Sequence, residues 1–156
     1  MRHIISVLLE NESGALSRVA GLFSARSFNI ESLSVAPSED ISASRMTIVT
    51  SGSDAVIVQI VKQLDKLIDV IEVSEITSNE HIEREIAFVK IEDKSIDKKM
   101  MTDFSKNEFL KIHKTDNNEI IIECVDSPKK INEFLKSVKK IAVKIVRSGS
   151  VGINSN

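Results

Sequence analysis

The sequence predicts an α+β protein with two tandem ferredoxin-like domains, each with the element order β-α-β-β-α-β. Alternating apolar and polar residues mark the expected strands, and apolar residues three or four positions apart mark the expected helices. This order is a split βαβ unit, in which a four-stranded antiparallel sheet carries both helices on one face. The order starts again after the polar residues 77–81, so we expect one domain at 1–77 and a second at 78–156.

The first half contains strands expected at residues 3–9, 30–35, 45–50 and 70–76. Two helices separate them, and the second is expected to begin after Ser53, because serine is a preferred helix cap. The apolar stripes of these helices are Leu16, Val19, Ala20 and Phe23 in the first, and Ile57, Ile60, Val61 and Leu64 in the second. The sheet face away from the helices needs a cover, and a second chain is the simplest candidate.

The second half repeats the pattern, with strands expected at residues 85–91, 109–114, 119–125 and 142–146. A weaker helix is expected over 95–104, and the turn-forming residues 115–118 join the middle two strands as a hairpin. Ser127 and Pro128 begin the clearest helix, since serine caps helices and proline suits the first helical position. Its apolar stripe is Ile131, Phe134, Leu135 and Val138. Residues 149–156 are expected to be a mobile tail.

Composition limits the class of protein. The chain has 156 residues, with 21 basic and 23 acidic side chains, so no strong basic field would attract nucleic acid or an anionic membrane. No apolar run approaches the roughly 20 residues of a membrane-spanning helix, and no cleavage-site pattern of a secretory signal follows the first strand. Cys124 is the single cysteine, which excludes an intrachain disulfide and a multi-cysteine metal site. We expect a soluble cytoplasmic protein.

The junction between the first strand and the first helix has the features of a small-molecule site. First-turn amides of a helix lack partners within the helix and lie at the positive end of its dipole, which suits a carboxylate. Asn11 and Asn29 add neutral amides that can hydrogen-bond both ends of an amino acid, and Gly14 allows its backbone to come close. The commoner alternative is that Ser13 or Gly14 only caps the helix and Asn29 only makes a turn.

Other functional classes find little support. His3, His81 and His113 are scattered at strand ends and in the linker, so no nucleophile stands beside a base. Cys124 lies in an apolar strand and is expected in the core. An RNA-binding sheet would need exposed aromatic residues, but the chain has no Trp or Tyr. We find no helix-turn-helix pattern, and the lysine pairs at 129–130 and 139–140 read as a solvated helix face.

Several stretches, in this order and spacing, resemble the acetolactate synthase (acetohydroxyacid synthase) small, regulatory subunit family. They are SVLLENESGALSRV at 6–19, NIESL at 29–33, SRMTI at 44–48, EREIAFVKI at 83–91 and RSG at 147–149. The resemblance is close through about residue 91 and looser beyond it. It implies an amino-acid-binding ACT domain at the N-terminus, a second ferredoxin-like domain behind it, and no catalytic activity in this chain.

The resemblance further implies a homodimer through the ACT domain that binds a large catalytic subunit, raises its activity and makes it sensitive to valine. Valine would lie between two chains. Asn11, Gly14, Ala15 and Leu16 of one chain and Asn29 and Ile30 of the other would hold it. No cofactor is expected in this chain, because thiamine diphosphate, magnesium and any FAD would belong to the large subunit. Neither nucleic acid nor a membrane is an expected partner.

One departure from the family pattern bears on valine control. The family often has glycine before the aromatic residue that precedes Asn29, and Ser27 stands there in this chain. If the turn needs a positive φ, serine costs free energy and can shift Asn29. An activating subunit with a weakened valine response is therefore one alternative to full valine control. A stand-alone amino-acid sensor is a second, separate alternative.

Overall fold

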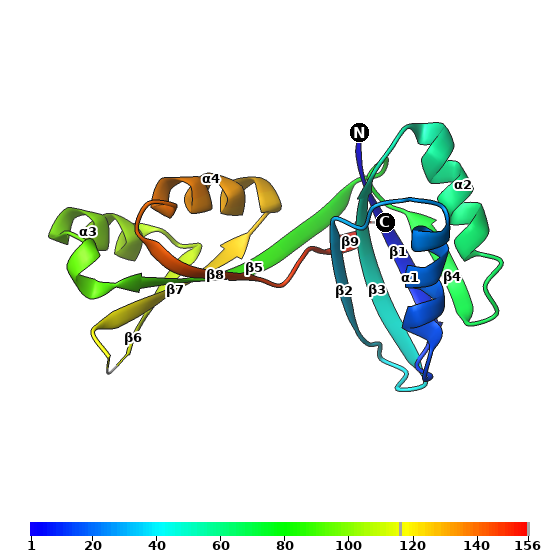
Figure 1. The fold of residues 1–156 in the computed structure, drawn as a ribbon, viewed down its shortest axis with the longest axis horizontal. Coiled ribbons are helices and arrows are strands. Elements are labelled where there is room, and N and C mark those ends of the chain that lie inside the picture. Colours follow the sequence, from blue (N-terminus) through cyan, green and yellow to red (C-terminus); the bar gives the residue numbers. More distant parts are fainter. Residues whose placement is uncertain (116, 156) are drawn as a thin grey trace. The chain divides into compact units, whose positions relative to one another are not determined.

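The computed structural model describes residues 1–115 and 117–155 and divides into two compact units (Figure 1). The first unit contains Met1–Ile82 together with residues that follow Gly149, and the second contains Glu83–Gly149. Each unit has the predicted β-α-β-β-α-β order and carries two helices on one face of an antiparallel sheet. The predicted fold class, two tandem ferredoxin-like domains, is confirmed.

The first unit has its strands in the order β2-β3-β1-β4, so β2 and β4 are the edges of the sheet. Every neighbouring pair of strands is antiparallel. The predicted strands and helices of this half all exist, with small shifts at their ends. They are β1 Arg2–Glu10, α1 Ala15–Ala25, β2 Ser32–Pro37, β3 Ala43–Ser51, α2 Asp54–Leu64 and β4 Val70–Glu75.

Alternate residues of β1 separate the two faces of this sheet. Ile5, Val7 and Leu9 are buried toward the helices and share one core with Phe23 of α1 and Ile60 of α2. Each such side chain contributes about 1.5–3 kcal/mol when it leaves water. Burial of this layer therefore holds α1 and α2 to the sheet.

The apolar stripe of α1 differs from the predicted one at its start. Val19 and Phe23 are buried as expected, but Ala15 and Leu22 complete the stripe, and Leu16 is 41% exposed. Leu16 follows Ala15 by one residue and so lies about 100° around the helix from it. It faces the loops at the helix start instead of the core.

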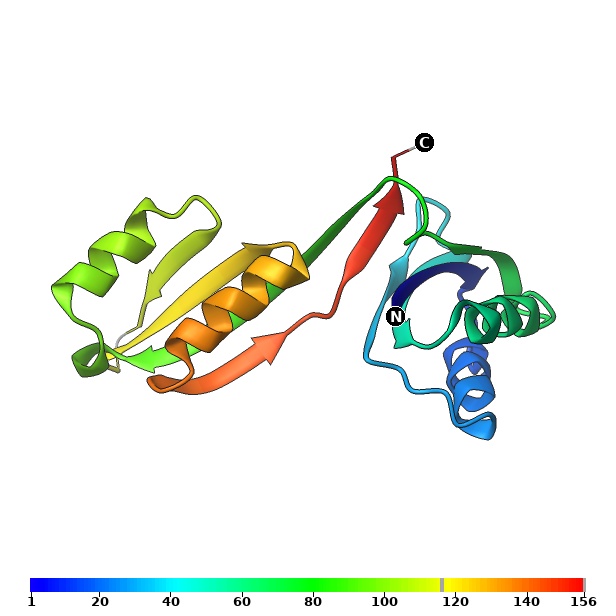
Figure 2. The same ribbon diagram turned by 90° about the horizontal axis from the view of Figure 1, so that it is seen from above.

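The tail predicted to be mobile instead forms a strand. β9, Val151–Asn154, pairs with the beginning of β5, His81–Glu92, and Ser155 N donates to Glu80 O at 2.9 Å. Figure 2 shows β9, in red, on the opposite side of β1 from α1 and α2. Part of the face expected to need a second chain is thus covered by this chain.

The contact between β9 and the sheet was not predicted from the sequence, because the residue that makes it is a glycine. The point of β9 nearest the sheet is Gly152, which lies over Ile4 and Ile76, two of the three residues buried together on that face. Val151 and Ile153, the apolar residues beside it, are more than half exposed. The strand touches the sheet with backbone, so hydrophobic periodicity does not reveal it.

Two glycine substitutions should change stability in opposite directions, and the one at Gly152 tests the packing of β9. A Cβ at Gly152 would lie 2.9 Å from Ile76 Cδ1, so Gly152→Val is expected to destabilise the chain by about 1–3 kcal/mol. Gly21, inside α1, has nothing within 4 Å of an added Cβ, so Gly21→Ala should stabilise it by about 0.5–1 kcal/mol. Urea unfolding of both variants measures the difference. A Gly152→Val chain as stable as wild type would show that β9 does not pack on the sheet.

The second unit has the strand order β6-β7-β5-β8, with α3 and α4 on one face. Its β5 begins at His81, inside the stretch expected to be a linker. The predicted hairpin of β6 and β7 is confirmed, although residue 116 of its turn lies outside the described residues. Beyond β5 the elements are a short 3-10 helix Asp93–Ser95, α3 Lys98–Lys106, β6 Leu110–Lys114, β7 Glu119–Asp126, α4 Pro128–Val138 and β8 Ala142–Arg147.

The two α-helices of this unit begin in different ways. The weaker helix begins at Lys98, because Asp97 accepts a hydrogen bond from Met100 N at 2.7 Å and fixes the first turn there. Ser127 precedes α4 as expected, but its side chain makes no capping hydrogen bond. Cys124 is fully buried as predicted, and burial raises the pKa of its thiol to about 11.

Two of the stretches that carry the family resemblance, residues 83–91 and 147–149, contact each other inside the second unit. Glu85 is buried, and its carboxylate accepts hydrogen bonds from Arg147 Nε and Nη2 at 2.6 and 2.7 Å. Next to this pair, Ile86 N donates to Ser148 Oγ at 3.1 Å. Residues 83–91 and 147–149 therefore serve the packing of β5 against β8.

Candidate functional site

A groove of about 230 Å³ lies where β1 ends, α1 begins and β2 ends. Asn11, Ala15 and Leu16 line one side of it, and residues 35–37 at the end of β2 line the other. We call it the helix-start groove. Complete ligand pockets commonly measure about 300–1,000 Å³, so this open groove has the size of part of a site.

Gly14 shapes the helix end of this groove. It precedes α1 with a φ of 95°, a conformation that glycine adopts without strain, and it offers no side-chain cap. Ala15 N donates to Glu12 O at 3.3 Å, and Arg18 N donates to Gly14 O at 2.9 Å. The amides of residues 16 and 17 lie between these two bonds, in the first turn, where an α-helix supplies no partner. They suit an external carboxylate.

Arg18 adds a positive charge that the sequence reasoning missed. Its guanidinium donates through Nε and Nη2 to the buried carboxylate of Asp69, with an Nη2–Oδ1 distance of 2.6 Å. Its Nη1 lies 3.1 Å from the place that a Cβ on Gly14 would occupy. The hydrogen bond from Arg18 lowers the pKa of Asp69, and the same bond raises the pKa of Arg18. Both groups stay charged beside the helix start.

The sequence contained part of the information needed to place Arg18 at the site. It stands four residues after Gly14, one helical turn away, and so on the same side of α1. Its partner Asp69 follows 51 residues later. No local pattern joins the two, so only the fold brings them together.

Asn11 is anchored to the next loop. Its backbone N donates to Ser42 O at 2.7 Å, and its side-chain Nδ2 donates to Ile41 O at 2.9 Å. One of the two hydrogens on the amide nitrogen is therefore used, which leaves the side chain a second donor and its oxygen acceptor. Both roles expected for this side chain, contact with a carboxylate and contact with an ammonium, are compatible with this arrangement.

Asn29 and Ile30 lie at the opposite end of β2 from the groove. Thr50 Oγ1 donates to Asn29 O at 2.6 Å, and Glu31 N donates to Val49 O at 2.8 Å, so this end is fixed on β3. From Asn29 to Pro37 an extended chain covers roughly 25 Å. A single chain thus brings Asn11, Ala15 and Leu16 together beside Gly14, and keeps Asn29 and Ile30 apart from them.

The turn before Asn29 does adopt the backbone conformation that glycine favours. Ser27, two residues after the end of α1, has a φ of 58°, and the next residue, Phe28, donates through its N to Phe23 O at 2.9 Å. Ser27→Gly removes the strain of a left-handed backbone in the folded state but raises the conformational entropy of the unfolded chain. Because the first effect is the larger, we expect a net stabilisation of about 0.5–1 kcal/mol. Urea unfolding measures this effect, and a Ser27→Gly chain less stable than wild type would contradict it.

The Arg18–Asp69 pair predicts a pH dependence of stability. Because the folded state lowers the pKa of Asp69, its contribution is present above the unfolded pKa of about 3.9 and is lost as pH falls through the folded pKa. Wild type should therefore exceed Asp69→Asn in urea midpoint at pH 7, with the gap closing below about pH 4. Glu39→Gln, at an exposed loop position, is the control. A gap that is constant from pH 7 to 3 would rule out the ionised pair.

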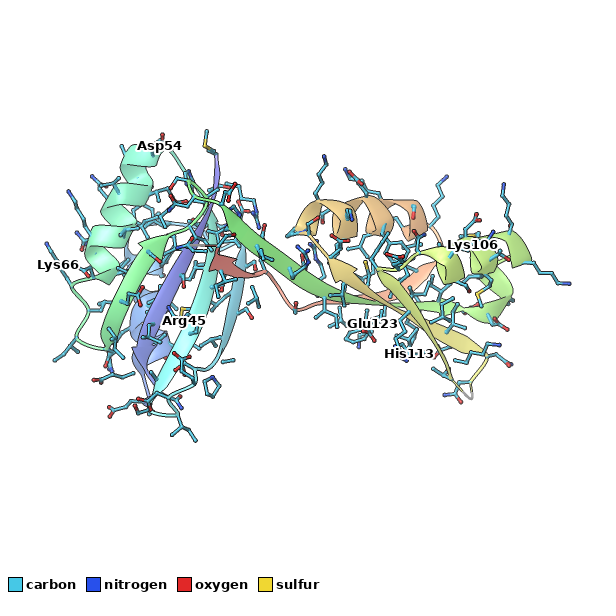
Figure 3. The ribbon with its side chains drawn as sticks, turned by 180° about the vertical axis from the view of Figure 1, so that it is seen from behind. Arg45, Asp54, Lys66, Lys106, His113 and Glu123 are labelled. Carbon is cyan, nitrogen blue, oxygen red and sulfur yellow. The ribbon has the colours of Figure 1, made fainter. Side chains whose placement is uncertain are left out.

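Two of the histidines each contact one polar partner. His113 Nε2 lies 2.7 Å from Glu123 Oε2 across the β6–β7 hairpin, on the surface of the second unit (Figure 3). His81 contacts the backbone O of Asn79. Among residues 1–115 and 117–155, no three His, Cys, Asp or Glu side chains are grouped to hold a metal ion. None of the helices in this part of the chain is long and apolar enough to cross a membrane.

Comparison with known proteins covers both units. Residues 5–72 match the family model "AHAS small subunit-like ACT domain", and residues 84–156 match "Small subunit of acetolactate synthase". The acetolactate synthase small subunit of Buchnera aphidicola subsp. Schizaphis graminum is 47% identical, with 98% of each chain covered. The isozyme 3 small subunit of Salmonella typhimurium is 46% identical, with 99% of this chain and 96% of that protein covered.

A solved structure agrees with these sequence matches. The crystal structure of the acetolactate synthase small subunit from Thermotoga maritima superposes with a TM-score of 0.88 at 33% identity, covering 100% of this chain and 98% of that one.

Proposed function

Because the chain belongs to the family of acetolactate synthase small subunits, we propose that it is a regulatory, non-catalytic subunit of that enzyme in branched-chain amino acid synthesis. It docks on a catalytic large subunit, raises its activity and makes it sensitive to valine. The observation that carries this proposal is the match of both units, over nearly their whole length, to proteins named as small subunits. Thiamine diphosphate, magnesium and any FAD belong to the large subunit in this proposal.

Valine is proposed to bind in the helix-start groove. Its carboxylate accepts from the first-turn amides of α1 beside Gly14, with the charge of Arg18 nearby. Its ammonium donates to the side-chain oxygen of Asn11. The exposed side chain of Leu16, together with Val35, offers an apolar surface to the isopropyl group.

A second chain completes the proposed site. β2 is an edge strand, so two chains can pair their β2 strands antiparallel about a two-fold axis. Antiparallel pairing sets the start of one β2 beside the end of the other. Asn29 and Ile30 of one chain then face the helix-start groove of its partner, although they are far from their own groove.

Reconstitution tests the proposal. Adding the purified chain to a catalytic large subunit of acetolactate synthase should raise the rate of acetolactate formation, and valine should then lower it. Alanine is the matched control, because it carries the same charged groups on a smaller side chain. If the rate does not change at any ratio of this chain to the large subunit, the proposed regulatory role is overturned.

The structure also bears on the second candidate, an activating subunit with a weakened valine response. The positive φ of Ser27 supports that candidate, whereas the anchoring of Asn29 by Thr50 opposes it. Activation without inhibition at saturating valine would select it. Calorimetry with the isolated chain then tells whether valine fails to bind or binds without effect.

A further inference from the structure

One end of the first unit carries two isoleucine side chains that are almost fully exposed. Ile41, in the loop between β2 and β3, is 82% exposed, and Ile68, in the loop between α2 and β4, is 89% exposed. Among the large apolar side chains of the described residues, only that of Met1 is comparably exposed. β3 and β4 lie on either side of β1, so the two loops are roughly 10 Å apart. We call this end, with Ile41 and Ile68 at its tips, the loop-end surface.

Hydrogen bonds join both loops to the end of β1. Asn11 N donates to Ser42 O at 2.7 Å on one side, and Glu10 N donates to Asp69 O at 2.8 Å on the other. Figure 1 shows the loops that follow β1 and β2 together at the lower end of the first unit. The loop-end surface is therefore one continuous surface, and through Asn11 it adjoins the helix-start groove.

The turn that carries Ile41 is fixed by its neighbours. The carboxylate of Asp40 accepts from Ser42 N at 2.9 Å and from Ser42 Oγ at 2.8 Å. Ala43 N donates to Asp40 O at 3.0 Å, and Asn11 Nδ2 donates to Ile41 O. The side chain of Ile41 is thus presented on an ordered turn, so little backbone entropy is lost when a partner covers it.

Ile68 is held outward by the residues on either side of it. Leu67 packs against the core of the first unit, and Asp69 is 5% exposed and paired with Arg18. The backbone between these two neighbours cannot turn Ile68 into the core without releasing one of them. Ile68 therefore has the properties of a binding anchor, because a partner gains by covering it and does not need to rearrange it.

The exposed charges around the two isoleucines are mainly acidic. Glu10 and Glu12 stand at the end of β1, and Glu39 and Asp40 lie in the loop that follows β2. Arg18, on α1, is already paired with a buried carboxylate. A partner for this surface should therefore present apolar groups flanked by lysine or arginine.

A second copy of this chain does not cover the loop-end surface in the proposed dimer. That dimer pairs two β2 strands edge to edge, whereas Ile68 adjoins β4, the opposite edge of the sheet. The chain is similar to proteins named as small subunits, so the other partner in the proposed function is a catalytic large subunit.

We propose that the loop-end surface is where the catalytic large subunit docks, an inference that rests on the proposed function. Ile41 and Ile68 enter apolar sites on that subunit, and basic groups there face the acidic residues around them. Asn11 lines the helix-start groove and also holds the loop of Ile41, so a ligand in the groove touches a residue that positions the docking surface. Docking and valine binding are therefore linked, and each should change the affinity for the other by the same factor.

Serine substitutions test the docking surface on the whole chain. Biolayer interferometry with the immobilised large subunit measures binding independently of any reaction rate. Ile41→Ser and Ile68→Ser should each weaken binding by about tenfold or more, and the double variant by about a hundredfold, because sites about 10 Å apart act nearly independently. Ile153→Ser also replaces an exposed isoleucine of the first unit, but on β9, so it is the matched control and should bind as wild type. Circular dichroism shows that each variant folds.

The outcomes separate this proposal from the regulatory one. A double variant that binds the large subunit like wild type overturns the docking surface and leaves the regulatory proposal standing. Docking that falls as expected, with a wild-type chain that changes no reaction rate, supports the docking surface and overturns the regulatory proposal. A wild-type chain that does not bind the large subunit overturns both.

Sedimentation of the chain alone tests the other occupant, a second copy. If the double variant loses self-association, and loses docking only as a result, a second copy covers the two isoleucines and the docking surface is overturned. Unchanged self-association together with weakened docking supports the large subunit as the occupant.

Discussion

A chain carrying Gly14→Asp is expected to bind valine at least about a hundredfold more weakly than wild type, a loss of about 2.8 kcal/mol. The new side chain starts where Gly14 now has only a hydrogen, 3.1 Å from Arg18 Nη1. Its carboxylate would lie over this guanidinium and the first-turn amides of α1. It would take the place proposed for the carboxylate of valine and also repel it.

Gly14→Asn is the matched control for this effect. Asparagine has nearly the same size as aspartate and tolerates a positive φ, but it carries no charge. If charge is the main cause, Asn should weaken valine binding much less than Asp. Calorimetry gives both affinities, and circular dichroism shows that both chains fold. A Gly14→Asp chain that binds valine like wild type would remove the helix-start groove from the site.

Mixing two inactive variants should restore valine binding. Gly14→Asp damages the groove that a chain offers, and Asn29→Ala damages the strand start that it contributes to its partner's groove. In a mixed dimer both defects fall in one site, and the other site is intact. Random mixing makes about half of the dimers mixed, so about a quarter of the wild-type valine sites should return.

The mixture distinguishes a shared site from one built within a single chain. Each variant alone should show almost no binding, because each homodimer carries the same defect in both sites. Refolding the two variants together and counting sites by calorimetry gives the answer. If no binding returns although mass spectrometry finds mixed dimers, Asn29 and Gly14 act in the same chain. Wild-type binding by Asn29→Ala alone would instead show that Asn29 has no part in the site.

The fold was predictable because its signals are local. Strand alternation and helical stripes lie within short windows, and the hairpin of β6 and β7 is encoded by its own turn. Two failures share one cause. β9 packs through Gly152, and α1 turns Leu16 away from the core, so in both cases the decisive contact involves backbone or orientation that hydrophobicity does not record.

The candidate site was predictable in part for the same reason. Asn11, Gly14, Ala15 and Leu16 are neighbours in sequence and stay neighbours in space. Arg18 escaped notice because its partner Asp69 comes from the loop before β4. The orientation of the Asn11 side chain depends on its hydrogen bond to Ile41 O, in a loop that no sequence pattern links to Asn11. Long-range partners decide these details, and a single sequence does not name them.

The return of β9 to the first unit has a consequence for synthesis on the ribosome. β1, β3 and β4 emerge before all of residues 83–149, and β9 emerges only after them. At roughly 5–20 residues per second, that interval lasts several seconds. During it Ile4 and Ile76 lack the contact that Gly152 later makes with them. A nascent first unit therefore presents an apolar face that chaperones or a neighbouring nascent chain can reach before β9 closes it.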